Sequence, residues 1–546
     1  MDESGWDSQE LRLCAGMTRG SRVWDGVQSH PGRSGTAWRF PVSWLASLAW
    51  LLTGVLGCGP PEREHRLAAF VAESGPQVLL SRGSGPPTSR IVVTGSGFVP
   101  GATAEIGWDG GDVATVMVDA DGSMMANIVV PAAALPGFHL VGVRTGDGGA
   151  ETQFLMRTNW PQLGFFPSRS GVNRFENVLG VENVAALAPR WSVKHGAQWI
   201  TPVVATGRVY APSTNGVLYA YDAASGRPLW VAETDGTSNP VSHRGLSTPA
   251  AAYGKVFVAS REGAVYAFAA RTGARLWKVP LSGRSTSAVV VADGLVYATT
   301  TEGTLAAMAE GGCGEAVCSP SWSTEVGGSN PTAPTVAHGK VFVAADGVGV
   351  RVFPAVDCSS APCAPLESLE TLGTSHGWLA IARERLAVQA QVNGQAMLLV
   401  FDLGTKKPLW QVDLGSARTE GMNGLAALAY DTVFVTASQA GPEGQGELRA
   451  YDLADGRLRW VFGFPAAPES TFDGMLSAPT VAGPLLFAAS NDTQETFVFR
   501  RVCLETAGCA PLAKLPGGWQ ASAAIVADGQ VYVSTVGGDL RAWSLP

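Results

Sequence analysis

The residues with the most distinctive spacing in this chain are its cysteines. Six of its eight cysteines form three close pairs, namely Cys313 and Cys318, Cys358 and Cys363, and Cys503 and Cys509. A zinc site usually needs four ligands, with cysteines two residues apart and histidines nearby, and the sequence has neither pattern. Paired cysteines are typical of an oxidising compartment. The spacing therefore predicts three local disulfides in an exported protein, and no metal site.

The other residues that could do chemistry form no familiar catalytic pattern. The sequence has no G-x-S-x-G, H-E-x-x-H or P-loop motif, and its 7 histidines are scattered. Asp119, Asp121 and Gly122 match only a fragment of a calcium loop, which favours a hairpin turn. His338, in the turn VAHGK, is predicted to be structural. No catalytic residue is predicted.

An apolar segment near the N-terminus predicts export. Residues 44–56, WLASLAWLLTGVL, are 13 residues without a charge, which is too short to cross a bilayer and suits a signal-peptide core. The segment ends in VLGC, which resembles the bacterial lipobox. That resemblance implies lipidation of Cys58, and Gly59 rather than Asp after it favours the outer membrane. A positive region before the core makes Met17 the expected true start.

Composition and charge exclude some classes of protein. The chain has 546 residues, 67 Gly, 34 Pro and only 15% charged residues, which favours many short strands joined by tight turns. Its formal charge is −8, and no Lys/Arg run could follow a phosphate backbone, so no nucleic-acid partner is expected.

Eight similar units, each about 40 to 50 residues long, recur in the second part of the chain. They begin and end near residues 201–230, 248–277, 287–308, 333–353, 378–410, 425–460, 478–499 and 522–545. A period of this length made of strands alone indicates a β-propeller, with one four-stranded blade per unit. The expected fold is therefore all-β, with an eight-bladed propeller.

The first unit shows how one blade is expected to form. Asn215-Gly216 predicts a tight hairpin, Asp222 and Gly226 suit the next turn, and Trp230 falls on the outermost strand. A buried tryptophan contributes a large apolar area. Equivalent tryptophans are predicted to lock neighbouring blades together, and they are Trp191, Trp230, Trp277, Trp322, Trp410 and Trp460.

These units resemble the PQQ-type propeller repeat, with its A-x-D-x-x-T-G-x-x-x-W core. The resemblance covers about residues 187–546, and 160–192 resembles the segment that precedes such propellers. The stretch APRWSVKHG reads as an outermost strand without a blade of its own, whereas the last unit lacks such a strand. The two ends of the propeller are therefore expected to meet in one blade, which would leave no open sheet edge.

A different pattern precedes the propeller. About six or seven alternating strands between residues 90 and 158 indicate a small β-sandwich. GSGFVPG followed by DADGS resembles bacterial immunoglobulin-like modules of the IPT/TIG kind. The expected organisation is a signal peptide (1–57), a lipidated Cys58 and linker (58–87), an Ig-like sandwich (88–158), a lead-in segment (159–186) and the propeller (187–546).

The PQQ-type resemblance implies two kinds of function. Its quinoprotein dehydrogenases need adjacent cysteines and a Glu, Asn and Asp set around calcium, and no such set is matched here. Its non-enzymatic branch includes the propeller lipoprotein that helps assemble outer-membrane β-barrels. The sequence is therefore interpreted as a non-enzymatic envelope lipoprotein without a cofactor, anchored by lipid only, that binds envelope proteins or peptide segments. A PQQ- and calcium-dependent dehydrogenase is one alternative, and surface adhesion or glycan binding is another.

Polar residues in the long loops between units are the candidate partner-binding rim. Loops on a rigid scaffold often carry function, although these side chains could equally be solvated loop charges. The six candidates are His243, Arg244, His376, Arg418, Glu420 and Asp473.

Overall fold

The structure of the protein is a computed structural model. The described residues are 75–194, 200–235, 245–285, 287–356, 358, 363–371, 378–416, 425–438, 446–465, 476–503, 509–518, 522–535 and 537–546. They form strands throughout, together with one short 3-10 helix, η3 (Val184–Ala186). Within these ranges, no helix has the length and apolar character needed to cross a membrane.

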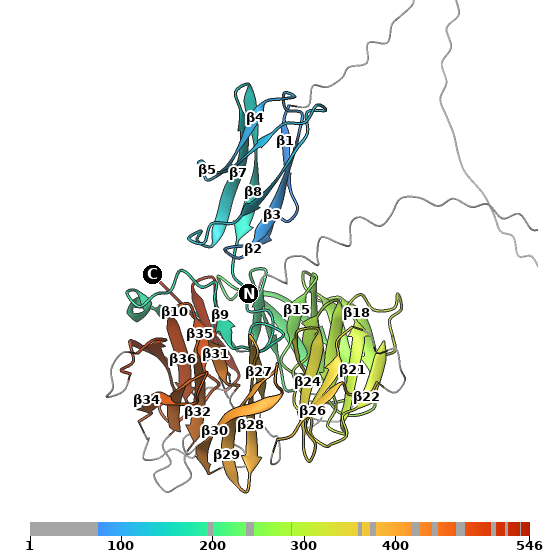
Figure 1. Ribbon diagram of the computed structural model, residues 1–546, viewed down its shortest axis with the longest axis vertical. Coiled ribbons are helices and arrows are strands. Elements are labelled where there is room, and N and C mark those ends of the chain that lie inside the picture. The colour runs from blue at the N-terminus through green and yellow to red at the C-terminus, as the bar shows by residue number, and fades with distance from the viewer. Residues whose placement is uncertain are drawn as a thin grey trace, which may run out of the picture.

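Residues 77–156 form a two-sheet β-sandwich that stands above a ring of sheets (Figure 1). One sheet has the order β1 (Gln77–Leu80), β3 (Arg90–Ser96), β6 (Met124–Val129), and the other has the order β2 (Ser84–Gly85), β8 (Gly148–Met156), β7 (Gly137–Thr145), β4 (Thr103–Trp108), β5 (Gly111–Met117). Alternate residues of both sheets, such as Ile91, Ile106 and Phe154, pack into one buried core. Membership of this sandwich in the IPT/TIG group stays a prediction.

The ring consists of sheets that each begin with a short apolar inner strand. In the described residues eight sheets have this form, with four strands in order from the inner to the outer edge of the ring, and the sheet that begins with β35 has a fifth strand, β9 (Val172–Asn173), which pairs parallel with its inner strand. They are β11 (Val203–Ala205), β12 (Arg208–Pro212), β13 (Val217–Asp222), β14 (Pro228–Glu233); β15 (Ala250–Ala252), β16 (Lys255–Ser260), β17 (Ala264–Ala269), β18 (Arg275–Pro280); β19 (Val290–Ala292), β20 (Leu295–Thr299), β21 (Thr304–Ala309), β22 (Trp322–Glu325); β23 (Thr335–Ala337), β24 (Lys340–Ala345), β25 (Gly349–Pro354), β26 (Glu367–Leu369); β27 (Leu379–Ala382), β28 (Arg385–Val392), β29 (Gln395–Asp402), β30 (Lys407–Ser416); β31 (Ala427–Ala429), β32 (Thr432–Ser438), β33 (Gly446–Asp452), β34 (Leu458–Gly463); β35 (Thr480–Ala482), β36 (Leu485–Ser490), β37 (Glu495–Arg500), β38 (Ala513–Pro516); and β39 (Ile525–Ala527), β40 (Gln530–Ser534), β41 (Asp539–Ser544), β10 (Ala188–Lys194).

The ring closes where the two ends of the repeat region meet. Strand β10 pairs antiparallel with β41, so the strand that precedes the first repeat completes the last sheet. From β11 to β35 each inner strand contacts the next, and β11 contacts β39. Thr480 Oγ1, on β35, donates to the Ala524 carbonyl just before β39 at 2.8 Å. This is the closure that the sequence predicted, and the predicted all-β propeller fold is confirmed.

Tryptophans on the outer strands lie against the turn of the next blade in the ring. The indole N–H groups of Trp191, Trp230, Trp277 and Trp410 donate to the carbonyls of Ala223, Ala270, Glu310 and Leu453 at 3.0, 3.1, 3.3 and 3.0 Å. Each of these carbonyls belongs to a β-turn between the third and fourth strands of the next sheet. Trp322 shares an apolar cluster with Cys358 and Cys363, and Trp460 shares one with Cys503 and Cys509. The six tryptophans thus join six pairs of neighbouring blades.

The structure joins two of the three predicted cysteine pairs. Disulfides link Cys313 to Cys318 and Cys358 to Cys363, with Cα atoms 5.7 and 5.4 Å apart. The prediction of a third bond is corrected, because no disulfide joins Cys503 to Cys509. These two cysteines flank residues 504–508, which lie outside the described residues, and the buried Cys509 Sγ lies 3.8 Å from the Arg500 carbonyl oxygen instead.

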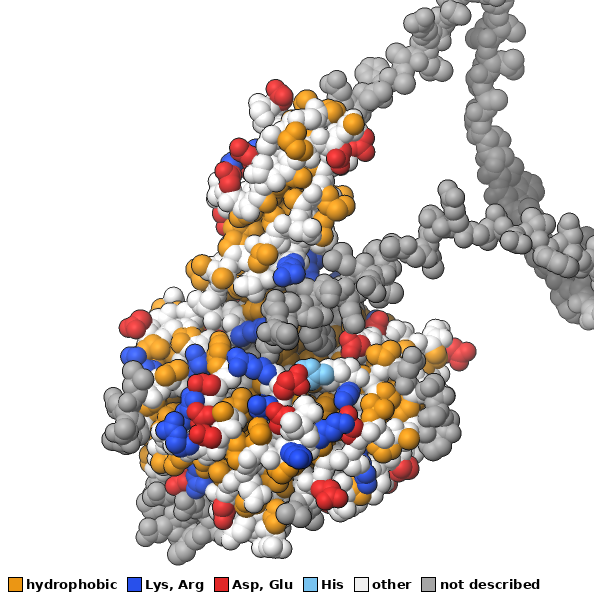
Figure 2. All heavy atoms as spheres, viewed as in Figure 1, with side chains coloured by type: hydrophobic (Ala, Val, Ile, Leu, Met, Phe, Trp, Pro, Cys, Tyr) orange, Lys and Arg blue, Asp and Glu red, His pale blue; other side chains and the backbone are white. Residues whose placement is uncertain are grey.

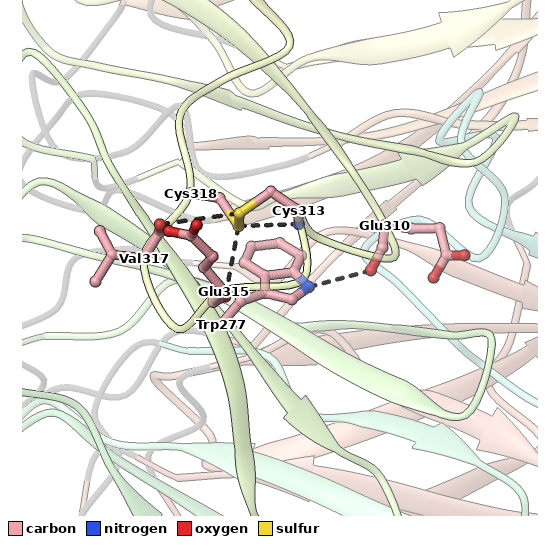
Figure 3. The surroundings of a disulfide bond; sticks show 6 residues. All are labelled: Trp277, Glu310, Cys313, Glu315, Val317 and Cys318. Carbon is pink, nitrogen blue, oxygen red and sulfur yellow. Dashed lines mark hydrogen bonds between the residues drawn. A yellow bond between two sulfur atoms is a disulfide. The ribbon is translucent and has the colours of Figure 1, made fainter. Parts of the chain in front are cut away.

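The loop held by Cys313 and Cys318 covers the outer edge of the preceding blade. Lys278, on β18, accepts a hydrogen bond from Cys318 N at 2.8 Å and donates one to the Ala316 carbonyl at 3.0 Å. Figure 3 shows the Trp277 indole beside this loop, with its N–H directed at Glu310. The disulfide therefore stabilises a loop that is part of the contact between two blades.

We expect removal of this disulfide to have a moderate effect on stability. Replacing both Cys313 and Cys318 by alanine should lower the free energy of unfolding by about 2 kcal/mol, because a short loop then gains freedom in the unfolded chain. Urea unfolding of the oxidised chain measures this. Stability equal to that of the oxidised wild type would contradict the expectation.

Candidate functional site in the axial channel

The six candidate rim residues cannot be placed in this structure. His243, Arg244, His376, Arg418, Glu420 and Asp473 all lie outside the described residues, as does Cys58. Their proposed roles therefore stay predictions. Among the described residues, the candidate site lies at the centre of the ring.

A segment before the first blade runs around the inside of the ring. Residues 160–173 are here called the axial segment. They form hydrogen bonds with the inner strand of each of the eight sheets of the ring in turn. Its oxygen atoms accept the backbone N–H groups of Val204, Ala251, Val291, Val336, Ile381, Leu428 and Val481 at 2.7 to 3.1 Å, and Asn173 Nδ2 donates to the Val526 carbonyl at 2.8 Å.

These bonds satisfy backbone groups that would otherwise be unpaired. An inner strand has a partner on one side only, and an unsatisfied buried backbone group costs roughly 1–3 kcal/mol. At the third blade the side chain of Gln162 replaces a backbone carbonyl, because its amide oxygen accepts the Val291 N–H at 3.1 Å. The axial segment therefore holds the inner edges of the blades and fills the channel at their middle level.

Two compact turns allow the axial segment to fit this space. Gly164 and Phe165 both have positive φ, of 74° and 76°, and Gly171 N donates to the Gly164 carbonyl at 3.0 Å. Phe165 packs edge-on against Trp160 and Phe166, with ring centres 5.2 and 4.5 Å apart. The segment is thus fixed by its own packing as well as by the blades.

The axial segment enters and leaves on the same side of the ring. Asp528, in the turn between β39 and β40, accepts the Thr158 N–H through Oδ1, and its own N–H donates to Thr158 Oγ1 at 2.7 Å. On leaving, Glu176 accepts the N–H groups of Leu179 at 2.9 Å and Gly529 at 3.3 Å. We call this side, which carries the turns between first and second strands, the turn face, and the opposite side the inter-blade face.

The carboxyl group of Asp528 is held in an unfavourable place for a charge. Burial raises its pKa from 3.8 to about 6, although hydrogen bonds from Thr158 and the charge of Arg157 act in the opposite direction and Glu176 adds to the rise. Burial also raises the pKa of Glu176 against its backbone hydrogen bonds. The hydrogen bonds that Asp528 and Glu176 make at the two ends of the axial segment are therefore sensitive to pH.

We expect Asp528→Asn to stabilise the ring at neutral pH. The folded chain keeps Asp528 protonated up to about pH 6 whereas the unfolded chain ionises it near 3.8, so stability should fall as the pH rises through this window. Asparagine keeps the acceptor for Thr158 and tolerates the φ of 52°, and it should gain up to about 3 kcal/mol above pH 6. Thermal unfolding of both proteins between pH 4 and 8 tests this, and parallel curves would contradict it.

Arg169 is the fully buried charge of the axial segment. Its Nη2 donates to the Ala288 carbonyl at 3.1 Å, and its guanidinium lies over the Trp378 ring, 5.7 Å from the ring centre. Neither Nε nor Nη1 has a hydrogen-bond partner among the residues that the structure describes, and burial lowers the pKa of Arg169 to about 9. Leu163, Ala288 and Ala333 form the apolar cluster beside it.

The channel residues that are described do not fit a quinone–calcium centre. No group of three or more His, Cys, Asp or Glu side chains that could hold a metal ion occurs in the described part of the chain. The surroundings of Arg169 are apolar, and both disulfides lie in turns toward the outside of the ring.

Sequence reasoning placed 159–186 as a lead-in but gave it no role, and it missed Arg169. The available signal was compositional, since WPQLGFFPSRSGVN holds three aromatic residues, two glycines and a single charge. Such a stretch is too apolar and too rich in turn residues for a solvated linker.

The comparisons with known proteins agree on the fold. A family model described as outer membrane protein assembly factor BamB matches residues 241–313, 261–360 and 395–544, just under half of the chain, which supports PQQ-like repeats. A search of curated proteins found no significant match.

Solved structures similar to the chain include a BamB structure and two dehydrogenases. BamB from Moraxella catarrhalis is 16% identical over 66% of this chain and 98% of its own, with a TM-score of 0.48. The quinohemoprotein alcohol dehydrogenase ADHIIG of Pseudomonas putida HK5 is 14% identical over 71% of this chain and 80% of its own, with a TM-score of 0.53. A europium-containing methanol dehydrogenase is 13% identical over 71% and 98%, with a TM-score of 0.51. At these identities the likeness is one of fold alone.

Proposed function

We propose that this chain is a non-enzymatic scaffold of the bacterial cell envelope whose ring binds a protein partner on its inter-blade face. The observation that carries the proposal is the axial segment, which fills the channel from the turn face with backbone bonded to the inner strands. Because the axial segment enters and leaves at the turn face, that side is occupied by the chain itself, which leaves the inter-blade face for a partner.

The position of the sandwich supports the choice of face. Asn177, just beyond the axial segment, donates through Nδ2 to the carbonyls of Ala132 at 3.3 Å and Ala134 at 2.8 Å, which lie in the sandwich. The sandwich therefore sits over the turn face (Figure 1). The wall of the ring seen in Figure 2 carries acidic and basic side chains intermixed, without a broad field of one sign.

Crosslinking in cells tests this function. A photo-crosslinking amino acid placed singly at positions 243, 376 and 418 should capture a discrete envelope protein. The same amino acid at Tyr253 and Tyr430, which are half exposed in turns of the opposite face, is the control. Capture from neither face, or equal capture from both, would contradict the proposal.

An envelope location follows from Cys58 in this proposal. Cys58→Ser should lose incorporation of a labelled fatty acid and move from the membrane fraction to the soluble one. Unchanged labelling would mean that the lipid is not on Cys58.

The alternative is a quinone-dependent dehydrogenase, which the fold likeness to two such enzymes keeps open. The purified protein with added PQQ and calcium should give no turnover in a dye-linked alcohol or sugar assay and should retain no quinone. Turnover above that of a heat-denatured control would replace the scaffold proposal.

A further inference from the structure

Arg169 has donors that nothing in the described structure uses. The side chain is fully buried, yet Nε and Nη1 lack hydrogen-bond partners among the described residues. An arginine is almost never buried in this way without a paired acceptor, because leaving a buried polar group of a charged side chain unsatisfied is costly. Such an arrangement is expected where an acceptor arrives from outside the chain.

The geometry of the guanidinium leaves one complete edge available. Nε and Nη1 lie on different edges, and each edge is shared with Nη2. Since Nη2 uses one of its two hydrogens on the Ala288 carbonyl, the other edge keeps two parallel N–H groups. Two parallel donors match the two oxygens of a carboxylate.

The guanidinium points toward the inter-blade face. Ala288 and Trp378 both come just before inner strands, β19 and β27, and so lie on the inter-blade side of the axial segment. Trp378 keeps some exposed surface, whereas Leu163, Ala288 and Ala333 are buried. The route from solvent to Arg169 therefore runs past the Trp378 indole.

We propose that Arg169 binds the carboxylate of an organic acid with an apolar body, which enters the channel from the inter-blade face. One positive charge matches a single carboxylate better than a phosphate dianion or a polycarboxylate, because the apolar cluster beside Arg169 brings no second cation. The cluster and the Trp378 ring suit the apolar part of the ligand. The carboxylate belongs either to a small acid or to the C-terminus of a peptide.

The test compares acids with their uncharged amides. Hexanoate and N-acetyl-leucyl-leucine are titrated into the full-length protein by calorimetry, with hexanamide, the C-terminal amide of the peptide and inorganic phosphate as controls. We expect the acids to bind at least tenfold more tightly than their amides. Binding of hexanoate alone identifies a small acid as the source, and tighter binding of the peptide identifies a C-terminus.

A matched pair of variants ties the binding to Arg169. Arg169→Met should lose at least tenfold in affinity for the acids, whereas Arg174→Met, at an exposed arginine just after the axial segment, should bind as the wild type does. Equal binding of acids and amides, binding of phosphate only, an unchanged affinity of Arg169→Met, or no binding at all would overturn the proposal. The acid–amide comparison needs no variant, so it stands even if Arg169→Met does not fold. Small acids are used throughout, so the result is independent of whether the crosslinking experiment finds a partner.

Discussion

Gly164→Ala should destabilise the ring by roughly 2–6 kcal/mol. A Cβ atom at Gly164 would lie 2.7 Å from Arg169 Cα and 2.8 Å from Leu425 Cδ2, so either the turn of the axial segment or the inner end of a blade must shift. The φ of 74° adds the strain of a left-handed conformation. Because the axial segment bonds to the inner strands around the whole ring, a displacement at Gly164 should weaken several blades together.

A second glycine of the ring separates the effect of the steric clash from that of the backbone strain. Gly254 has a φ of 69°, and a Cβ atom there would meet nothing within 4 Å. Gly254→Ala should therefore show only the conformational strain, of about 1–2 kcal/mol. Urea unfolding of both variants measures the difference. If the two substitutions cost the same, the axial segment does not hold the ring in the way described.

The architecture of the ring could be predicted because its signals are local and repeated. The repeats share an apolar inner strand and tight turns between strands, and six of the eight outer strands carry a tryptophan. The pairing of β10 with β41 could also be predicted, because the sequence showed an extra strand before the first repeat and no outermost strand in the last repeat.

The role of the axial segment could not be predicted, because its partners lie in all parts of the ring. Trp160 bonds to Val204, while Asn173 bonds to Val526, more than 350 positions along the chain. The segment occurs once, so no period reveals it, and its bonds are made mainly by backbone groups that any residue carries. Arg169 and Asp528 are ordinary polar residues in the sequence, and only burial makes them unusual.

The cysteines mark the limit of reasoning from spacing. All three pairs are five or six positions apart, yet the structure links two of them and not Cys503 to Cys509. Close spacing allows two sulfur atoms to meet, but it does not fix the Cα separation and Cβ directions that a disulfide requires.

The second large effect on stability is expected at the contact between two blades. Trp277→Ala should lower the free energy of unfolding by about 3–5 kcal/mol. The Trp277 indole is buried against Phe257, and its N–H donates to the Glu310 carbonyl at 3.3 Å. Trp322→Ala should cost less, since Trp322 is half-buried and its Nε1 has no hydrogen-bond partner among the described residues. Chemical unfolding of both variants compares them, and a larger loss at Trp322 would contradict this ranking.

Two glycines in the Cys313–Cys318 region test the same contact from the other blade. Gly312 and Gly314 both have positive φ, of 76° and 85°, so alanine is strained at either position. A Cβ atom at Gly312 would lie 2.4 Å from Trp277 Cδ1, whereas one at Gly314 would meet nothing within 4 Å. Gly312→Ala should therefore lose more stability than Gly314→Ala, and the excess should disappear when Trp277 is also replaced by alanine, because the clash then has no partner. An excess that persists without the tryptophan would place its cause in the turn itself and not in the packing between blades.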